Sequence, residues 1–79
     1  MTEIVRINVG VSRELQVKLE AGSITVSEFA HAIGLRQVDT GKLKDFGILT
    51  GEAEAGRLDD IRKRTGIDFV EEDRPRPAT

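Results

Sequence analysis

The sequence predicts an α+β fold in which a four-stranded antiparallel sheet carries two helices on one face. Three observations support this prediction: alternating β-branched residues near the start, a strand pattern near the end, and helical caps and periodicity between them. With 79 residues, the chain is long enough for one small domain. We assign residues 1–73 to that domain and residues 74–79 to a flexible tail, because this last segment is too polar and proline-rich to pack.

The first strand is predicted at residues 3–11. Apolar and polar residues alternate there with the period of two that a half-buried strand requires, and most of the apolar ones are β-branched. One face carries Val5, Ile7, Val9 and Val11, and the other carries Arg6, Asn8 and Gly10.

Residues 12–22 fit either a strand or a helix. Apolar residues at every second position from Leu15 to Leu19 suit a strand. The same two leucines also lie four residues apart, as on one face of a helix, in which Glu14 and Lys18 would form an ion pair. We favour the helix.

A second helical segment is predicted at residues 25–34. Thr25 and Glu28 have the spacing of a capping box, in which two side chains satisfy free amides of the first turn. One apolar face follows, and Gly34 suits the end of the helix; the residues of that face are Val26, Phe29, Ala30 and Ile33. The alternative is a strand over residues 24–29, where side chains also alternate.

Three further strands and a helix are predicted after residue 34, the first of these strands within residues 35–45. The segment 35–45 contains a turn signal at Asp39-Thr40-Gly41, and residues 46–51 fit a short buried strand bounded by glycine. Residues 54–65 fit a helix with Gly66 as its stop, and residues 67–70 fit a last strand. The helix would bury Ala55, Leu58 and Ile61 and form the ion pairs Asp59–Lys63 and Asp60–Arg64.

The element order is therefore strand, helical region, strand, strand, helix, strand. This is the order of the βαββαβ, ferredoxin-like sandwich. The predicted core consists of Val5, Ile7, Val9, Phe29, Ile33, Ile48, Leu58, Ile61 and Phe69.

Composition excludes several classes of protein. The chain has no cysteine, which rules out disulfides and thiolate metal sites and favours the cytoplasm as its location. The net charge is −2 and the three aromatic residues lie outside basic clusters, so we expect no nucleic-acid partner. No stretch approaches the roughly 18 apolar residues of a membrane span, so we expect no membrane partner.

Candidate catalytic chemistry is also missing from the sequence. His31 is the single histidine, and we interpret it as a surface residue because no second histidine or cysteine could share a metal with it. The acidic pair Asp59-Asp60 fits an exposed helix turn, and no serine has a plausible base and acid. We therefore expect no enzyme activity, no metal and no cofactor.

The C-terminal half resembles the propeptide-like inhibitors of subtilisin-type proteases, including their free-standing cytoplasmic relatives. The resemblance covers residues 34–73 and rests mainly on residues 46–53, 58–62 and 66–73. In that family a strand and a helix lead to a strand of the form Val-x-x-Val-Glu-Glu-Asp, which the segment from Ile67 to Asp73 matches with isoleucine in the first place.

The resemblance implies binding by fit rather than by chemistry. The open face of the sheet would pack on the protease, and Glu71, Glu72 and Asp73 would cap exposed helix N-termini of that enzyme. Pro77, Ala78 and Thr79 would enter the active-site groove as a product-like strand.

We therefore expect a non-catalytic protein-binding module that acts as a protease inhibitor or folding aid, with a subtilisin-type serine protease as the candidate partner. The alternative is a regulatory or structural ferredoxin-like module, which dimerises or docks on an unrelated protein through its sheet. The chain would be a monomer or a homodimer.

Overall fold

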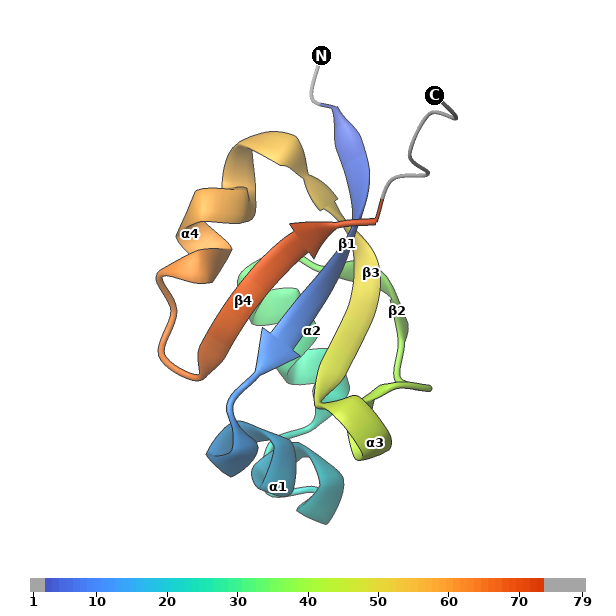
Figure 1. Cartoon of the computed structure of the whole chain (residues 1–79), viewed down its shortest axis with the longest axis vertical. Helices are drawn as coiled ribbons and strands as arrows, with labels where there is room; N and C mark the ends of the chain where they lie inside the picture. The colour runs from blue at the N-terminus through green and yellow to red at the C-terminus, as the bar shows by residue number, and fades with distance from the viewer. Residues whose placement is uncertain (1–2, 74–79) are drawn as a thin grey trace.

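The computed structural model describes residues 3–73 and combines one antiparallel sheet with helices (Figure 1). The strand predicted at the start of the chain is confirmed, with a boundary one residue later than expected. In chain order the elements are β1 (Ile4–Val11), α1 (Arg13–Ala21), α2 (Val26–Ile33), β2 (Arg36–Asp39), α3 (Leu43–Phe46), β3 (Ile48–Glu54), the 3₁₀ helix η1 (Ala55–Arg57), α4 (Leu58–Arg62) and β4 (Ile67–Glu72).

The sheet has four strands in the order β2-β3-β1-β4, and every neighbouring pair is antiparallel. The predicted α+β class and its four-stranded antiparallel sheet are confirmed. The central pair, β1 and β3, places Ile7 opposite Gly51 and Val9 opposite Leu49. These residues are buried, so one face of the sheet forms a wall of the core.

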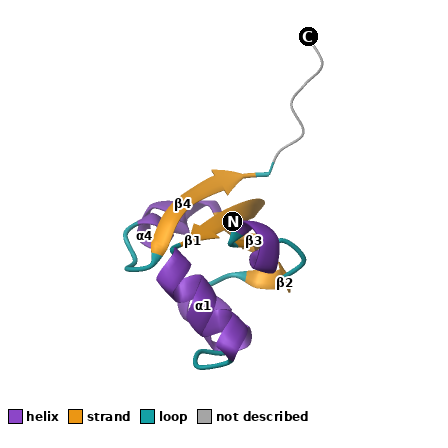
Figure 2. Ribbon diagram, turned by 60° about the horizontal axis from the view of Figure 1, so that its bottom comes forward, coloured by secondary structure: helices purple, strands orange, loops and turns teal. Residues whose placement is uncertain are grey.

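Both helices favoured for residues 12–34 are present, and the strand alternatives are wrong. Each begins at a capping side chain: the Ser12 hydroxyl accepts from Leu15 N at 3.2 Å, and the Thr25 hydroxyl accepts from Glu28 N at 3.1 Å. The predicted pair of Glu14 and Lys18 is also formed, at 3.5 Å. In Figures 1 and 2 α1 lies beyond the ends of the strands, whereas α2 lies behind the sheet.

The second half of the chain departs from prediction in its boundaries. β3 begins two residues later than expected, because Phe46 belongs to α3, a one-turn helix that the sequence did not predict. The helix predicted at residues 54–65 is shorter, comprising η1 and α4. It ends early because the chain must turn into β4, a turn in which Ile67 N donates to Arg64 O. The observed ion pair of this helix is Asp59–Arg62, at 2.9 Å.

The core contains most of the residues predicted for it. Phe29 and Ile48 are only half-buried, and the assignment of Phe69 to the core is wrong, because it is 39% exposed. Val70 takes the place expected for Phe69: it lies opposite Val9 in register, and the next residue along a strand points to the other face. The predicted residues that are buried are Val5, Ile7, Val9, Ile33, Leu58 and Ile61.

The outer strand β2 is irregular. Between Arg36 and Asp39 it has one residue more than the facing part of β3, which is the pattern of a β-bulge. Gln37 lies in this bulge with a φ of 52°, a left-handed conformation that residues other than glycine rarely adopt. No helix within residues 3–73 has the length and apolar character needed to cross a membrane.

Candidate protein-binding face

One face of the sheet carries no helix across its centre. In Figure 1 α2 lies behind the strands and α4 lies beside β4, and α4 packs on the buried side of the sheet through Leu58 and Ile61. The strand register assigns residues of all four strands to the near side, called here the open face: Ile4, Arg6, Asn8 and Gly10 from β1, Ile48, Thr50, Glu52 and Glu54 from β3, Phe69 and Glu71 from β4, and Arg36 and Asp39 from β2.

On the open face, an aromatic ring lies over a glycine near the C-terminal end of β1. Gly10 is opposite Ile48 on one side and opposite Phe69 on the other. A Cβ atom built on Gly10 would lie only 2.1 Å from Cε2 of Phe69, so the ring occupies the space above this glycine. Glycine inside a strand often marks such a close approach, and here it lets Phe69 lie flat across β1.

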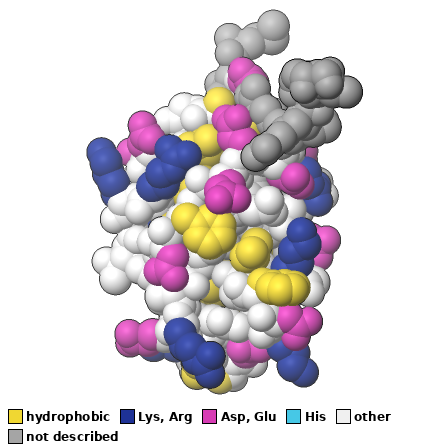
Figure 3. Space-filling view, viewed as in Figure 1, with side chains coloured by type: hydrophobic (Ala, Val, Ile, Leu, Met, Phe, Trp, Pro, Cys, Tyr) yellow, Lys and Arg dark blue, Asp and Glu magenta, His cyan; other side chains and the backbone are white. Residues whose placement is uncertain are grey.

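We use the name open-face cluster for Phe46, Ile48 and Phe69. Phe46 ends α3 two residues before Ile48 and is 71% exposed, more than any other large apolar residue among those described. Ile48 is half-buried beside the ring of Phe69. Figure 3 shows apolar side chains gathered on this side of the molecule, with acidic side chains around them.

Two pairs of polar side chains on the open face are already formed within the sheet. The Thr50 hydroxyl donates to Asn8 Oδ1 at 2.8 Å, and Thr50 is 6% exposed. Arg6 Nε lies 3.5 Å from Asp73 Oδ2. Because these contacts fix the side chains before any partner arrives, little side-chain entropy would be lost on docking.

The three predicted acidic site residues are all exposed, but they do not share one surface. Glu71 lies opposite Asn8 on the open face, whereas Glu72 lies opposite Ile7 and belongs to the other side of the strand. Asp73 is held to β1, since its N donates to Arg6 O at 2.7 Å in addition to the ion pair. The other predicted site residues, Pro77, Ala78 and Thr79, lie outside the described residues.

The free edge of β4 is partly covered. Asp73 N points to β1, so the alternation along a strand directs the main-chain groups of Val70 away from β1. Arg62 from α4 reaches this edge, donating from Nη2 to Val70 O at 3.2 Å and from Nη1 to Asp59 Oδ1 at 2.9 Å. A charged side chain over an edge strand disfavours the addition of another strand there.

The single histidine lies away from this face, and no metal-binding group of side chains is found in the described part of the chain. His31 is exposed, as predicted, and it lies on α2 behind the sheet. Within residues 3–73, no three side chains of histidine, aspartate or glutamate are grouped so that they could hold a metal ion. The groups that the open face offers are exposed apolar side chains and polar side chains, some of them paired.

Comparison with known proteins gives no function for this face. Comparison of the chain with protein-family models, with curated proteins and with solved structures found no match. The resemblance to propeptide-like inhibitors therefore stays a prediction from the sequence.

Replacing Gly10 with alanine should dislodge the ring of Phe69. The added methyl group would overlap the ring, and the ring can swing outwards because Phe69 is partly exposed. We expect a loss of about 1 kcal/mol in the free energy of unfolding, from lost burial of the ring. Urea denaturation of Gly10→Ala, Phe69→Ala and the double variant checks this. The loss of stability in the double variant should be smaller than the sum of the two single losses by at least about 0.5 kcal/mol. A double-variant loss equal to that sum would mean that the ring does not lie on Gly10.

Proposed function

We propose that this chain is a non-catalytic domain that binds another protein through the open-face cluster of Phe46, Ile48 and Phe69. The observation that carries the proposal is the exposure of two aromatic rings, at 71% and 39%, on or beside a sheet face whose centre has no helix over it. Aromatic residues are enriched at protein interfaces, and neighbouring exposed apolar side chains commonly mark them. The covered edge of β4 favours docking through the face over docking by strand addition.

We further propose that the fold is the ferredoxin-like sandwich. Support comes from the two crossover connections. β1 and β2 are joined through helices and both run antiparallel to β3, which lies between them. β3 and β4 are joined through η1 and α4, with β1 between them in the same way. Two such split βαβ units make the ferredoxin-like arrangement.

The partner that the sequence resemblance favours is a subtilisin-type serine protease, with the cytoplasm as the site of action. Inhibition would follow from docking of the open face on the protease surface, with residues 74–79 directed to the active-site groove. Glu71 fits a role beside the apolar cluster, because it is exposed on the open face two residues after Phe69, and Asp73 is exposed just beyond the end of β4. Carboxylates placed there could interact with free amides at a helix N-terminus of the enzyme.

The test is inhibition of a subtilisin-type protease by the full-length chain at micromolar concentration. Deleting residues 74–79 should weaken inhibition at least about tenfold, or about 1.4 kcal/mol. Replacing Glu71, Glu72 and Asp73 with alanine should also weaken it, more at low salt than at high salt. Circular dichroism of each variant serves as the folding control.

Absence of inhibition by the full-length chain at this concentration would contradict the protease as partner. Size-exclusion chromatography over a range of concentrations would then test the alternative, a homodimer formed through the same face. A concentration-dependent dimer that Phe69→Ala disrupts would support that alternative.

A further inference from the structure

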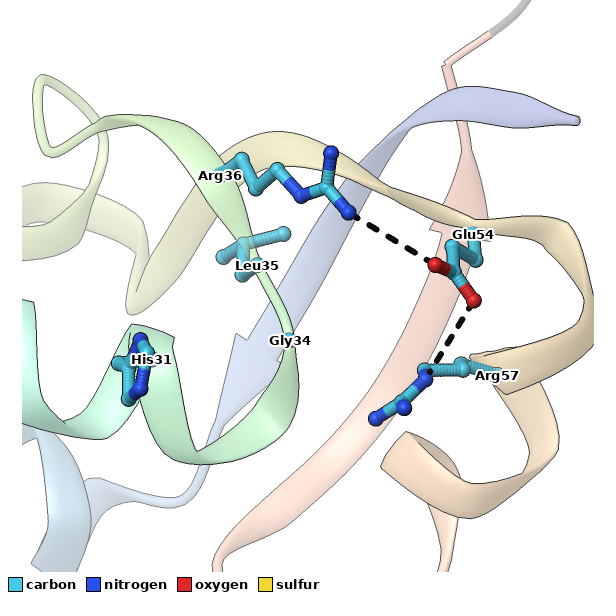
Figure 4. A pocket seen from close by; sticks show the side chains of 6 residues that line it. All are labelled: His31, Gly34, Leu35, Arg36, Glu54 and Arg57. Atoms are coloured by element: carbon cyan, nitrogen blue, oxygen red, sulfur yellow. Dashed lines mark ion pairs between the residues drawn. The ribbon is translucent and has the colours of Figure 1, made fainter. Parts of the chain in front are cut away.

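Two arginine side chains meet one carboxylate at the junction of α2, β2 and η1. Arg36 Nη2 lies 3.7 Å from Glu54 Oε1, and Arg57 Nε lies 3.5 Å from Glu54 Oε2. Figure 4 shows the two guanidinium groups approaching the carboxylate from opposite sides. They line a pocket of about 230 Å³ together with His31, Gly34 and Leu35.

Both guanidinium groups keep most of their hydrogen-bonding capacity. The contacts with Glu54 are longer than the 2.7–2.9 Å or so of a charge-assisted hydrogen bond. Within residues 3–73, Glu54 is the only ion-pair partner of Arg36 and of Arg57, and neither side chain forms a further hydrogen bond there. Each guanidinium carries five N–H donors, so most of them remain available to a ligand.

The charge balance of this pocket favours an anion. Two guanidinium groups face a single carboxylate, which leaves one positive charge uncompensated among the lining groups. Glu52 lies opposite Arg36 in register, but the ion pair that Arg36 forms is with Glu54. Arg57 is positioned by packing over Gly34 at the end of α2, where the helix dipole favours a cation.

A groove with a mixed polar and apolar lining continues from this pocket. A second cavity, of about 440 Å³, shares His31 and Leu35 with the first and runs between α2 and β2. Its apolar lining consists of Val26, Ala30, Leu35 and Val38. The left-handed Gln37 also lines it, and residues held in uncommon conformations are concentrated at ligand sites.

We propose that these two adjoining pockets bind a small molecule in which a carboxylate is joined to an apolar body. The carboxylate accepts hydrogen bonds from Arg36 and Arg57, and the apolar body lies along Ala30 and Val38. Arg36 and Glu54 belong to the open face by strand register, but the site contains none of the residues of the open-face cluster, so the proposal does not depend on docking through that cluster.

The test is a titration of the full chain with hexanoate, followed by the NMR signals of the arginine Nε–H groups and of the amides of α2 and β2. Hexanoate should bind at least about fivefold more tightly than acetate, which has no apolar body, and than hexanol, which has no charge. Arg36→Gln and Arg57→Gln should each weaken hexanoate binding at least about threefold. The expected effect is modest because both side chains are exposed to solvent. Lys44→Gln is the matched control, because it removes an exposed positive charge outside both pockets and should change nothing.

Glu54→Gln gives the sharpest result, because it removes the competing carboxylate. If the arginines bind the ligand, this variant should bind hexanoate more tightly than the wild-type chain. If the three side chains only stabilise the fold, Glu54→Gln should leave binding unchanged or weaken it. That outcome, or equal affinities for hexanoate, acetate and hexanol, would overturn the proposal. The inhibition test of the open face would be unaffected by either result.

Discussion

Replacing Ile61 with alanine is expected to lower the free energy of unfolding by about 2–5 kcal/mol. Ile61 lies on α4, is 1% exposed, and belongs to the core between this helix and the sheet. Truncation removes buried methyl and methylene groups and leaves a cavity that the surrounding elements can only partly fill. A domain of this size has a small core, so the loss is a large share of its stability. Thermal and urea denaturation measure the effect, with a fall in Tm of roughly 4–8 °C for each kcal/mol.

Val17→Ala is the control for Ile61→Ala. Val17 is 54% exposed on α1, so its truncation should change the free energy of unfolding by no more than about 0.5 kcal/mol. Equal effects of the two substitutions would show that α4 does not pack on the sheet as described.

Replacing Phe69 with aspartate is expected to weaken binding to the partner protein at least about thirtyfold, or about 2 kcal/mol. The ring belongs to the open-face cluster, and a charged side chain in its place would have to lose its hydration on docking. The measurement is the inhibition constant against a subtilisin-type protease. Val17→Asp is the matched control, because it places the same charge at an exposed apolar position on α1. Unchanged inhibition by Phe69→Asp would exclude the open-face cluster from the interface.

Local signals in the sequence predicted the first half of the fold well. The alternation of Val5, Ile7 and Val9 lies within one strand, and it identified both the strand and its buried face. The Glu14–Lys18 spacing and the capping box that begins at Thr25 act over three or four residues, so a helix in each segment could be favoured without knowledge of the rest of the chain.

The face of β4 could not be assigned in the same way. In residues 67–70 large apolar side chains point to both faces, so the pattern does not say whether Phe69 or Val70 enters the core. The choice depends on the pairing of β4 with β1, which places Val70 opposite Val9. Gly10 was the one local signal that a side chain lies over the outer side of β1, because a glycine inside a strand often marks a close approach.

The candidate sites show the same division between local and long-range information. The acidic run at residues 71–73 was identified from its sequence, but strand alternation separates its members. In the cluster of Arg36, Glu54 and Arg57, the last two are only three residues apart, but Arg36 comes from the start of β2 and joins them only through the fold. The helix α3 was missed because a single turn lacks both a capping side chain and a periodic apolar face.

The most direct test of docking through the open face is an NMR comparison of backbone amides in the free chain and in its complex with a subtilisin-type protease. The largest chemical-shift changes should fall on Asn8, Thr50 and Phe69, whose side chains lie on this face in three adjacent strands. Amides of α2 and α4, on the other side of the sheet, should change little. Changes concentrated on α2, on α4 or along β2, with the centre of the sheet unaffected, would contradict docking through the open-face cluster.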